Sequence, residues 1–198
     1  MHVIYLGMAA AVLGYIYYRE EILLTITSVS FFSIGLLVGA CLYASYHRLI
    51  DGTAWTLYLI LTLMIMSFTF VLIDGALYPE YAPAGLDSLQ TIFREQKLAG
   101  LIKALHIETI SWLVTHVFGI VILFFIQIRL SLSLGHYLSV VNLATSVEPW
   151  QMTIWFYKKT KRYQNPLENS LILLGSCAAA YVLINGIFYM WFMTLFKS

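Results

Sequence analysis

Residues 107–129 read IETISWLVTHVFGIVILFFIQIR. Glu108 and Arg129 are the only charged residues in this stretch, and the 20 positions between them hold no Asp, Glu, Lys or Arg. An α-helix needs about 20 predominantly apolar residues to cross the hydrocarbon core of a bilayer. The stretch therefore predicts a transmembrane helix over about 107–128.

The rest of the chain has the same character. Of its 198 residues, 61% are hydrophobic and only 11% are charged, and its mean hydropathy is +0.82. A soluble domain is about 45–50% apolar and about 25% charged. We therefore predict an all-α polytopic membrane helix bundle in which residues 1–198 form a single membrane domain. The predicted spans are 3–18, 22–46, 53–78, 107–128 and 167–196, with a six-span arrangement as the alternative.

Short polar segments separate these runs. The charged run at 19–21 predicts a tight helical hairpin between the first two spans. Pro79 and Pro83 end the third span, because proline cannot continue a helix. The segment 79–106 is predicted to be an extracytoplasmic linker with an amphipathic helix. The apolar positions in it change face near 94–97, which predicts a break and a second helix that runs on into the fourth span.

The segment 129–166 is predicted to lie at the cytoplasmic membrane interface rather than to span the membrane. Polar residues alternate with apolar ones over 130–146, and Pro149 interrupts the run, which makes this a poor span. Aromatic residues followed by a basic cluster suit the headgroup layer. The candidate lipid-facing or partner-docking residues are Trp150, Trp155, Lys158, Lys159, Lys161 and Arg162.

The basic cluster at 158–162 also predicts the orientation of the chain. Cytoplasmic loops of membrane proteins are rich in Lys and Arg, and this cluster directly precedes the last span. With five spans the N-terminus is then cytoplasmic, and with six it lies outside. We expect an integral protein of the cell membrane or inner membrane.

Ionisable groups within the apolar runs are candidates for a polar or ion path, because charge inside a bilayer is costly. Asp74 and Glu108 are predicted to lie at the same membrane face. His116 is expected about 13 Å inside the fourth span, close to the midplane, and Ser111 and Thr115 belong to a polar stripe beside it. The alternative interpretation of this helix face is packing against another helix through small and hydroxyl residues. The alternative for the two carboxylates is that each pairs locally or extends to the water at the membrane surface.

Small residues four positions apart predict close helix packing, within the chain or between copies. The pairs include Gly35 with Gly39 and Gly175 with Ala179. Asn185, near the middle of the last predicted span, could form a hydrogen bond across such a contact. These faces led us to expect a homo-oligomer.

Motifs of catalysis are missing from the sequence. It has no HExxH motif, serine elbow or Walker loop. Cys41 and Cys177 lack the spacing of a metal site, and the histidines are not matched in depth as haem ligands would be. We therefore expect no enzymatic activity, cofactor or metal, and no direct contact with nucleic acid.

Two functions remain. The first is a non-enzymatic, oligomeric membrane subunit that anchors or senses for a larger assembly with a soluble cytoplasmic partner. Secretion, envelope signalling and defence systems are all compatible with it. The alternative is a small ion or proton channel or transporter that uses the fourth helix.

Overall fold

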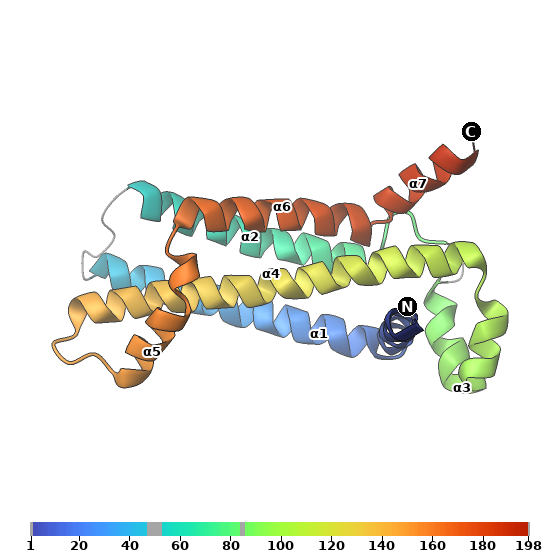
Figure 1. Cartoon of the computed structure of the whole chain (residues 1–198), viewed down its shortest axis with the longest axis horizontal. Coiled ribbons are helices and arrows are strands. Elements are labelled where there is room, and N and C mark those ends of the chain that lie inside the picture. Colours follow the sequence, from blue (N-terminus) through green and yellow to red (C-terminus); the bar gives the residue numbers. More distant parts are fainter. Residues whose placement is uncertain (1, 47–52, 84–85, 198) are drawn as a thin grey trace. The chain divides into compact units, whose positions relative to one another are not determined.

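The computed structural model describes residues 2–46, 53–83 and 86–197, and these are helical apart from short connections. The structure is 90% helical, and none of the described residues forms a strand, which confirms the all-α prediction. In chain order the elements are α1 His2–Tyr46, α2 Thr53–Leu77, α3 Leu86–Ala104, α4 Ile107–Thr145, α5 Gln151–Lys159, the 3-10 helix η1 Lys161–Tyr163, α6 Pro166–Ile184 and α7 Ile187–Lys197 (Figure 1).

Four of the described helices are long and apolar enough to cross a membrane, where about five spans were predicted. They are Gly7–Tyr46, Thr56–Leu77, Ile107–Thr145 and Pro166–Ile184. The number is lower because the first two predicted spans both lie in α1. The hairpin predicted at 19–21 is wrong, since no proline or glycine ends the helix there. In its place α1 has a kink at Tyr18 (φ −108°, ψ 23°).

The contacts divide the chain into two compact units, and the long helices pass through both. Unit 1 comprises Met1–Thr27, Val71–Leu123 and Ala178–Ser198, and unit 2 comprises Ser28–Phe70 and Phe124–Cys177. Each unit gathers segments that are far apart in the sequence. The two are therefore described separately.

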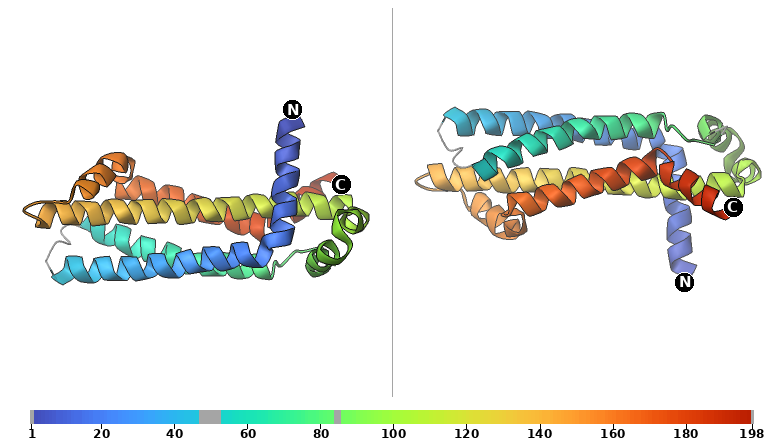
Figure 2. Two further views of the ribbon diagram at one scale, coloured as in Figure 1. Left: turned by 90° about the horizontal axis from the view of Figure 1, so that it is seen from below. Right: turned by 90° about the horizontal axis from the view of Figure 1, so that it is seen from above.

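In unit 1 the first part of α1, before the kink, runs across the direction of α4 (Figure 2). Its inner end packs in an apolar cluster formed by Ile16, Leu89, Trp112 and Leu113. This cluster joins α1 and α3 to the start of α4. The packing of the first part of α1 thus follows from its apolar residues beside the kink.

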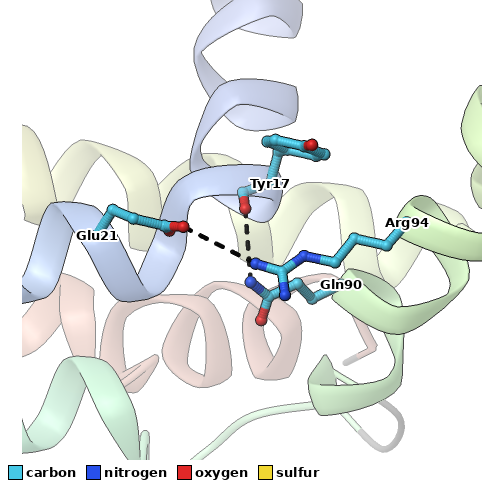
Figure 3. Close-up of polar contacts among 4 residues, drawn as sticks. All are labelled: Tyr17, Glu21, Gln90 and Arg94. Atoms are coloured by element: carbon cyan, nitrogen blue, oxygen red, sulfur yellow. Dashed lines mark hydrogen bonds and ion pairs between the residues drawn. The ribbon is translucent and has the colours of Figure 1, made fainter.

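Helix α3 is also tied to α1 by polar contacts (Figure 3). The Gln90 amide donates to the Tyr17 carbonyl at 3.4 Å, and Arg94 lies 3.9 Å from the Glu21 carboxylate. Both charged groups are about half exposed, so this ion pair contributes no more than about 1 kcal/mol. The break expected within the linker falls at Lys97, with φ 57°. The second part of α3 ends at Ala104, so it does not run on into α4.

The last predicted span is divided into two helices. Asn165 begins α6 by accepting a hydrogen bond from the Glu168 N–H at 3.3 Å, with Pro166 at the first helical position. The helix ends at Ile184, and Gly186 has φ 76° before α7 starts. A left-handed residue cannot continue an α-helix. The run 167–196 is therefore not one continuous helix.

In unit 2 helix α4 continues 16 residues beyond Arg129, where the fourth span was expected to end. The hydroxyl groups of this part donate to carbonyls of the preceding turn, as Ser133 does to Leu130 and Ser139 to Gly135. Such bonds satisfy polar side chains inside a helix. The polar residues at 130–146 therefore do not end the helix, which runs to Thr145.

Candidate functional site

His116 lies at the centre of unit 1 and is completely buried. Its Nδ1 lies 2.8 Å from the Ile184 carbonyl oxygen, its Nε2 lies 2.9 Å from the Tyr15 hydroxyl, and its ring stacks on Trp112 with centroids 4.5 Å apart. A carbonyl only accepts, so Nδ1 carries the proton and donates to Ile184. In the neutral ring Nε2 then accepts from Tyr15. Both ring nitrogens are thus occupied by hydrogen bonds within the protein.

The partners of His116 also fix its level in the bundle. Ile184 is the last residue of α6. His116 therefore lies level with the end of α6, although its position in the sequence placed it near the middle of the fourth span. The residues of α4 before His116, 107–115, therefore precede the level at which α6 ends.

The other candidates for a polar path do not converge on His116. The side chains of Asp74, Glu108 and Ser111 are exposed. Thr115 donates to the Trp112 carbonyl within its own helix at 2.8 Å. His116 therefore contacts two aromatic residues, Tyr15 and Trp112, and the last carbonyl of α6, rather than carboxylates.

Sequence reasoning missed Arg19 as part of this region. Its guanidinium donates to the Ala76 carbonyl at 2.9 Å and to the Leu77 carbonyl at 2.6 Å. These are the last carbonyls of α2, which have no partner within the helix, and a cation there also interacts favourably with the helix dipole. No local pattern links residues 57 or 58 positions apart, so this contact could not be predicted from the sequence.

The small residues differ in their surroundings. A Cβ added to Gly35, Gly39 or Gly175 would meet nothing within 4 Å, and Ala179 is exposed. Asn185 is buried, and its amide oxygen would lie 2.9 Å from a Cβ on Gly75. Asn185 therefore packs within the chain, whereas the other four positions are open.

In unit 2, α5 and η1 present what we name the basic surface. All of its six residues are exposed: Trp150, Trp155, Lys158, Lys159, Lys161 and Arg162.

Buried contacts with α4 hold the basic surface in place. Thr160 donates to the Phe156 carbonyl at 2.7 Å, so it accepts from Nδ1–H of His136 at 2.9 Å. The His136 ring stacks on Tyr157 with centroids 5.3 Å apart. A Cβ at Gly135 would lie 2.7 Å from the Phe156 ring, so glycine permits this approach.

A second polar cluster surrounds Arg129, which the sequence analysis treated only as the end of a span. Its Nε donates to Asn169 Oδ1 at 2.7 Å, and Asn169 Nδ2 donates to the Tyr58 hydroxyl at 3.1 Å. The Arg129 guanidinium carbon lies 5.3 Å from the centroid of the Tyr163 ring, and that of Arg162 lies 4.9 Å from the same centroid. The chain thus brings two cations to one buried aromatic ring.

The chain matches no known protein family, no curated protein and no solved structure. Its function is therefore argued from its own residues. Within the described ranges, no three His, Cys, Asp or Glu side chains gather in a way that could hold a metal ion. The described residues thus form three sites of specific contacts: the His116 cluster, the basic surface and the Arg129 cluster.

Proposed function

We propose that this chain is a multi-pass membrane subunit, without enzymatic activity, that anchors a soluble cytoplasmic partner through the basic surface. The observation that carries the proposal is that the surface is exposed while the residues behind it are held in contacts with α4. Its aromatic and basic side chains are exposed. Behind them, Thr160 is hydrogen-bonded to His136 of α4, and Phe156 packs against Gly135 of the same helix. A pre-organised surface binds with a smaller loss of conformational entropy.

The position of the basic surface supports this function. Arg129 is bonded to Asn169, which is close to the start of α6. Helix α5 meets α4 at Gly135 and His136, six and seven residues farther along. At 1.5 Å per residue this is about 10 Å beyond Arg129. If α6 spans the membrane, the basic surface lies outside the hydrocarbon core.

The composition of the basic surface indicates an acidic partner. The sequence has no aspartate or glutamate between Glu148 and Glu168, and it has four basic residues there. Opposite charge on a partner speeds its association and selects against wrong partners. The exposed Trp150 and Trp155 would anchor the contact, because tryptophan is enriched at binding hot spots. The positive-inside rule supports placing this surface, and with it the N-terminus in a five-span arrangement, in the cytoplasm.

Self-association is part of the proposal. Gly35 and Gly39 are exposed on α1, and Leu42 lies on the same helix face, three residues after Gly39 and seven after Gly35. Glycines four positions apart let two helices approach closely. We propose that a second copy of the chain packs on this face.

Purification from the native cell in a mild detergent tests the partner. A K158Q/K159Q variant should lose a soluble companion that the unchanged chain retains. The matched control is R94Q/K97Q, which removes two exposed positive charges from α3. The proposal fails if the unchanged chain carries no soluble protein, or if both variants lose it equally.

The channel alternative has less support. Its central residue, His116, has both ring nitrogens bonded to Tyr15 and Ile184. Its proposed rim residues, Asp74 and Glu108, are exposed and do not bond to it. Ion or proton flux through the purified chain in liposomes that His116→Ala abolishes would favour transport over anchoring.

A further inference from the structure

Two arginines, Arg129 and Arg162, lie beside the ring of Tyr163. In the ranges that the structure describes, neither Arg129 nor Arg162 forms an ion pair. Their guanidinium carbons lie 5.3 and 4.9 Å from the centroid of one ring. Both guanidinium groups are positively charged and, among the described residues, neither is balanced by a carboxylate, so an anion that contacts both would be bound favourably. We propose that Arg129 and Arg162 bind the phosphate group of an anionic membrane lipid.

The cluster holds Arg129 in one orientation. Asn169 is 1% exposed and Tyr163 is 4% exposed, so the groups that contact Arg129 are themselves fixed by packing. The Nε–H of Arg129 donates to Asn169 Oδ1. The N–H groups on the two terminal nitrogens of the guanidinium are then left to donate to a ligand. A guanidinium matches the oxygens of a phosphate through two parallel hydrogen bonds. Arg129 is thus positioned before the anion binds.

The level of the cluster favours a lipid as the source of the phosphate. Helix α6 has 19 residues, which gives a length of about 29 Å, close to the thickness of a hydrocarbon core. Asn169 is the fourth residue of this helix. If α6 spans the membrane, Arg129 lies about one turn inside its end, within reach of the lipid phosphates. Arg162, which is exposed in η1, approaches the same ring.

The two arginines supply the positive charge of the cluster, because the other groups that contact Arg129 are neutral. Arg129 is bonded to the amide of Asn169 and stacked on Tyr163, which are both neutral. Glu168, the acidic residue next to Asn169, is exposed and makes no ion pair with either arginine. With a phosphodiester bound, which carries one negative charge, the site keeps a net charge of one positive unit. It would then still be attracted to the anionic headgroups around it. Phosphatidylglycerol has such a headgroup.

The test measures lipid retained by the full chain. The protein is reconstituted in nanodiscs of phosphatidylcholine with about one third phosphatidylglycerol, released, and weighed by native mass spectrometry. The unchanged chain should retain phosphatidylglycerol. R129Q and R162Q should each lower the fraction that carries it about tenfold, the effect of losing one charge-assisted hydrogen bond. R94Q, which removes an exposed arginine from α3, is the matched control and should retain the lipid.

Each result decides the proposal. Equal retention by R129Q and R162Q and the unchanged chain would overturn it, as would an equal loss in R94Q. R162Q keeps the test valid if R129Q does not fold, because Arg162 is exposed. Inorganic phosphate at millimolar concentration should not displace the lipid; if it does, the site takes free phosphate and the lipid source is wrong. The inference stands apart from partner docking: K158Q/K159Q should retain the lipid even where it loses the partner.

Discussion

The junction of α6 and α7 gives the sharpest test of the fold, through Gly186→Ala. Gly186 has φ 76°, a conformation that costs a residue with a Cβ about 1–2 kcal/mol. The added methyl group would also lie 2.5 Å from Trp112 Nε1 and 3.0 Å from the Tyr81 carbonyl oxygen. Trp112 is fully buried and stacked on His116, so its ring cannot move freely. Overpacking of this kind costs about 1–3 kcal/mol.

Together these effects predict a loss of about 2–5 kcal/mol in the free energy of unfolding. For a chain of this size, each kcal/mol lowers the melting temperature by about 2–4 °C. The matched control is Gly175→Ala in the interior of α6, where an added Cβ meets nothing within 4 Å. Alanine is favoured over glycine in a helix by about 0.5–1 kcal/mol. The control should therefore raise the melting temperature slightly.

Thermal unfolding of both variants in the same detergent, followed by the loss of helical circular dichroism, measures the two shifts. Opposite signs are expected. A Gly186→Ala variant as stable as the unchanged chain would refute the reasoning. It would mean that α6 and α7 are not joined through a left-handed residue against Trp112.

Two further predictions concern the His116 cluster and self-association. Tyr15→Phe removes the donor to His116 Nε2 and leaves a buried acceptor unpaired, so the free energy of unfolding should fall by about 1–3 kcal/mol. Tyr17→Phe, at an exposed ring, should change it little, and equal melting temperatures for the two variants would contradict the structure. In a chain without its native cysteines, Leu42→Cys (67% exposed) should form disulfide-linked dimers on oxidation, whereas Met64→Cys (63% exposed, on α2) should not. Crosslinking of both or of neither would argue against the proposed face.

The sequence was sufficient for the class of fold, because that class follows from composition and local pattern. Long runs without charge predict helices that cross a membrane, and Pro79 ended the third run close to Leu77, where α2 ends. It also located the basic surface, because the residues that form it are neighbours in the chain. Their exposure agrees with their charge.

Continuity of the helices was less predictable. The sequence suggested a hairpin at 19–21 and an interfacial segment from 129 onward, yet α1 and α4 continue through these positions. Polar residues do not end a helix when their groups find partners. Arg19 donates hydrogen bonds to carbonyls at the end of α2. Ser133 and Ser139 donate to carbonyls of their own helix. Such partners are not visible in a local pattern.

What the sequence determined by itself is that the protein is a helical membrane protein with a compact run of basic and aromatic residues. What only the tertiary structure decided is which polar groups meet. His116 bonds to Tyr15, which is 101 positions away, and Arg129 to Asn169, which is 40 positions away. Apolar burial is set by the composition of each helix, whereas a hydrogen bond requires two particular atoms within about 3 Å. That condition depends on how helices distant in the sequence pack together.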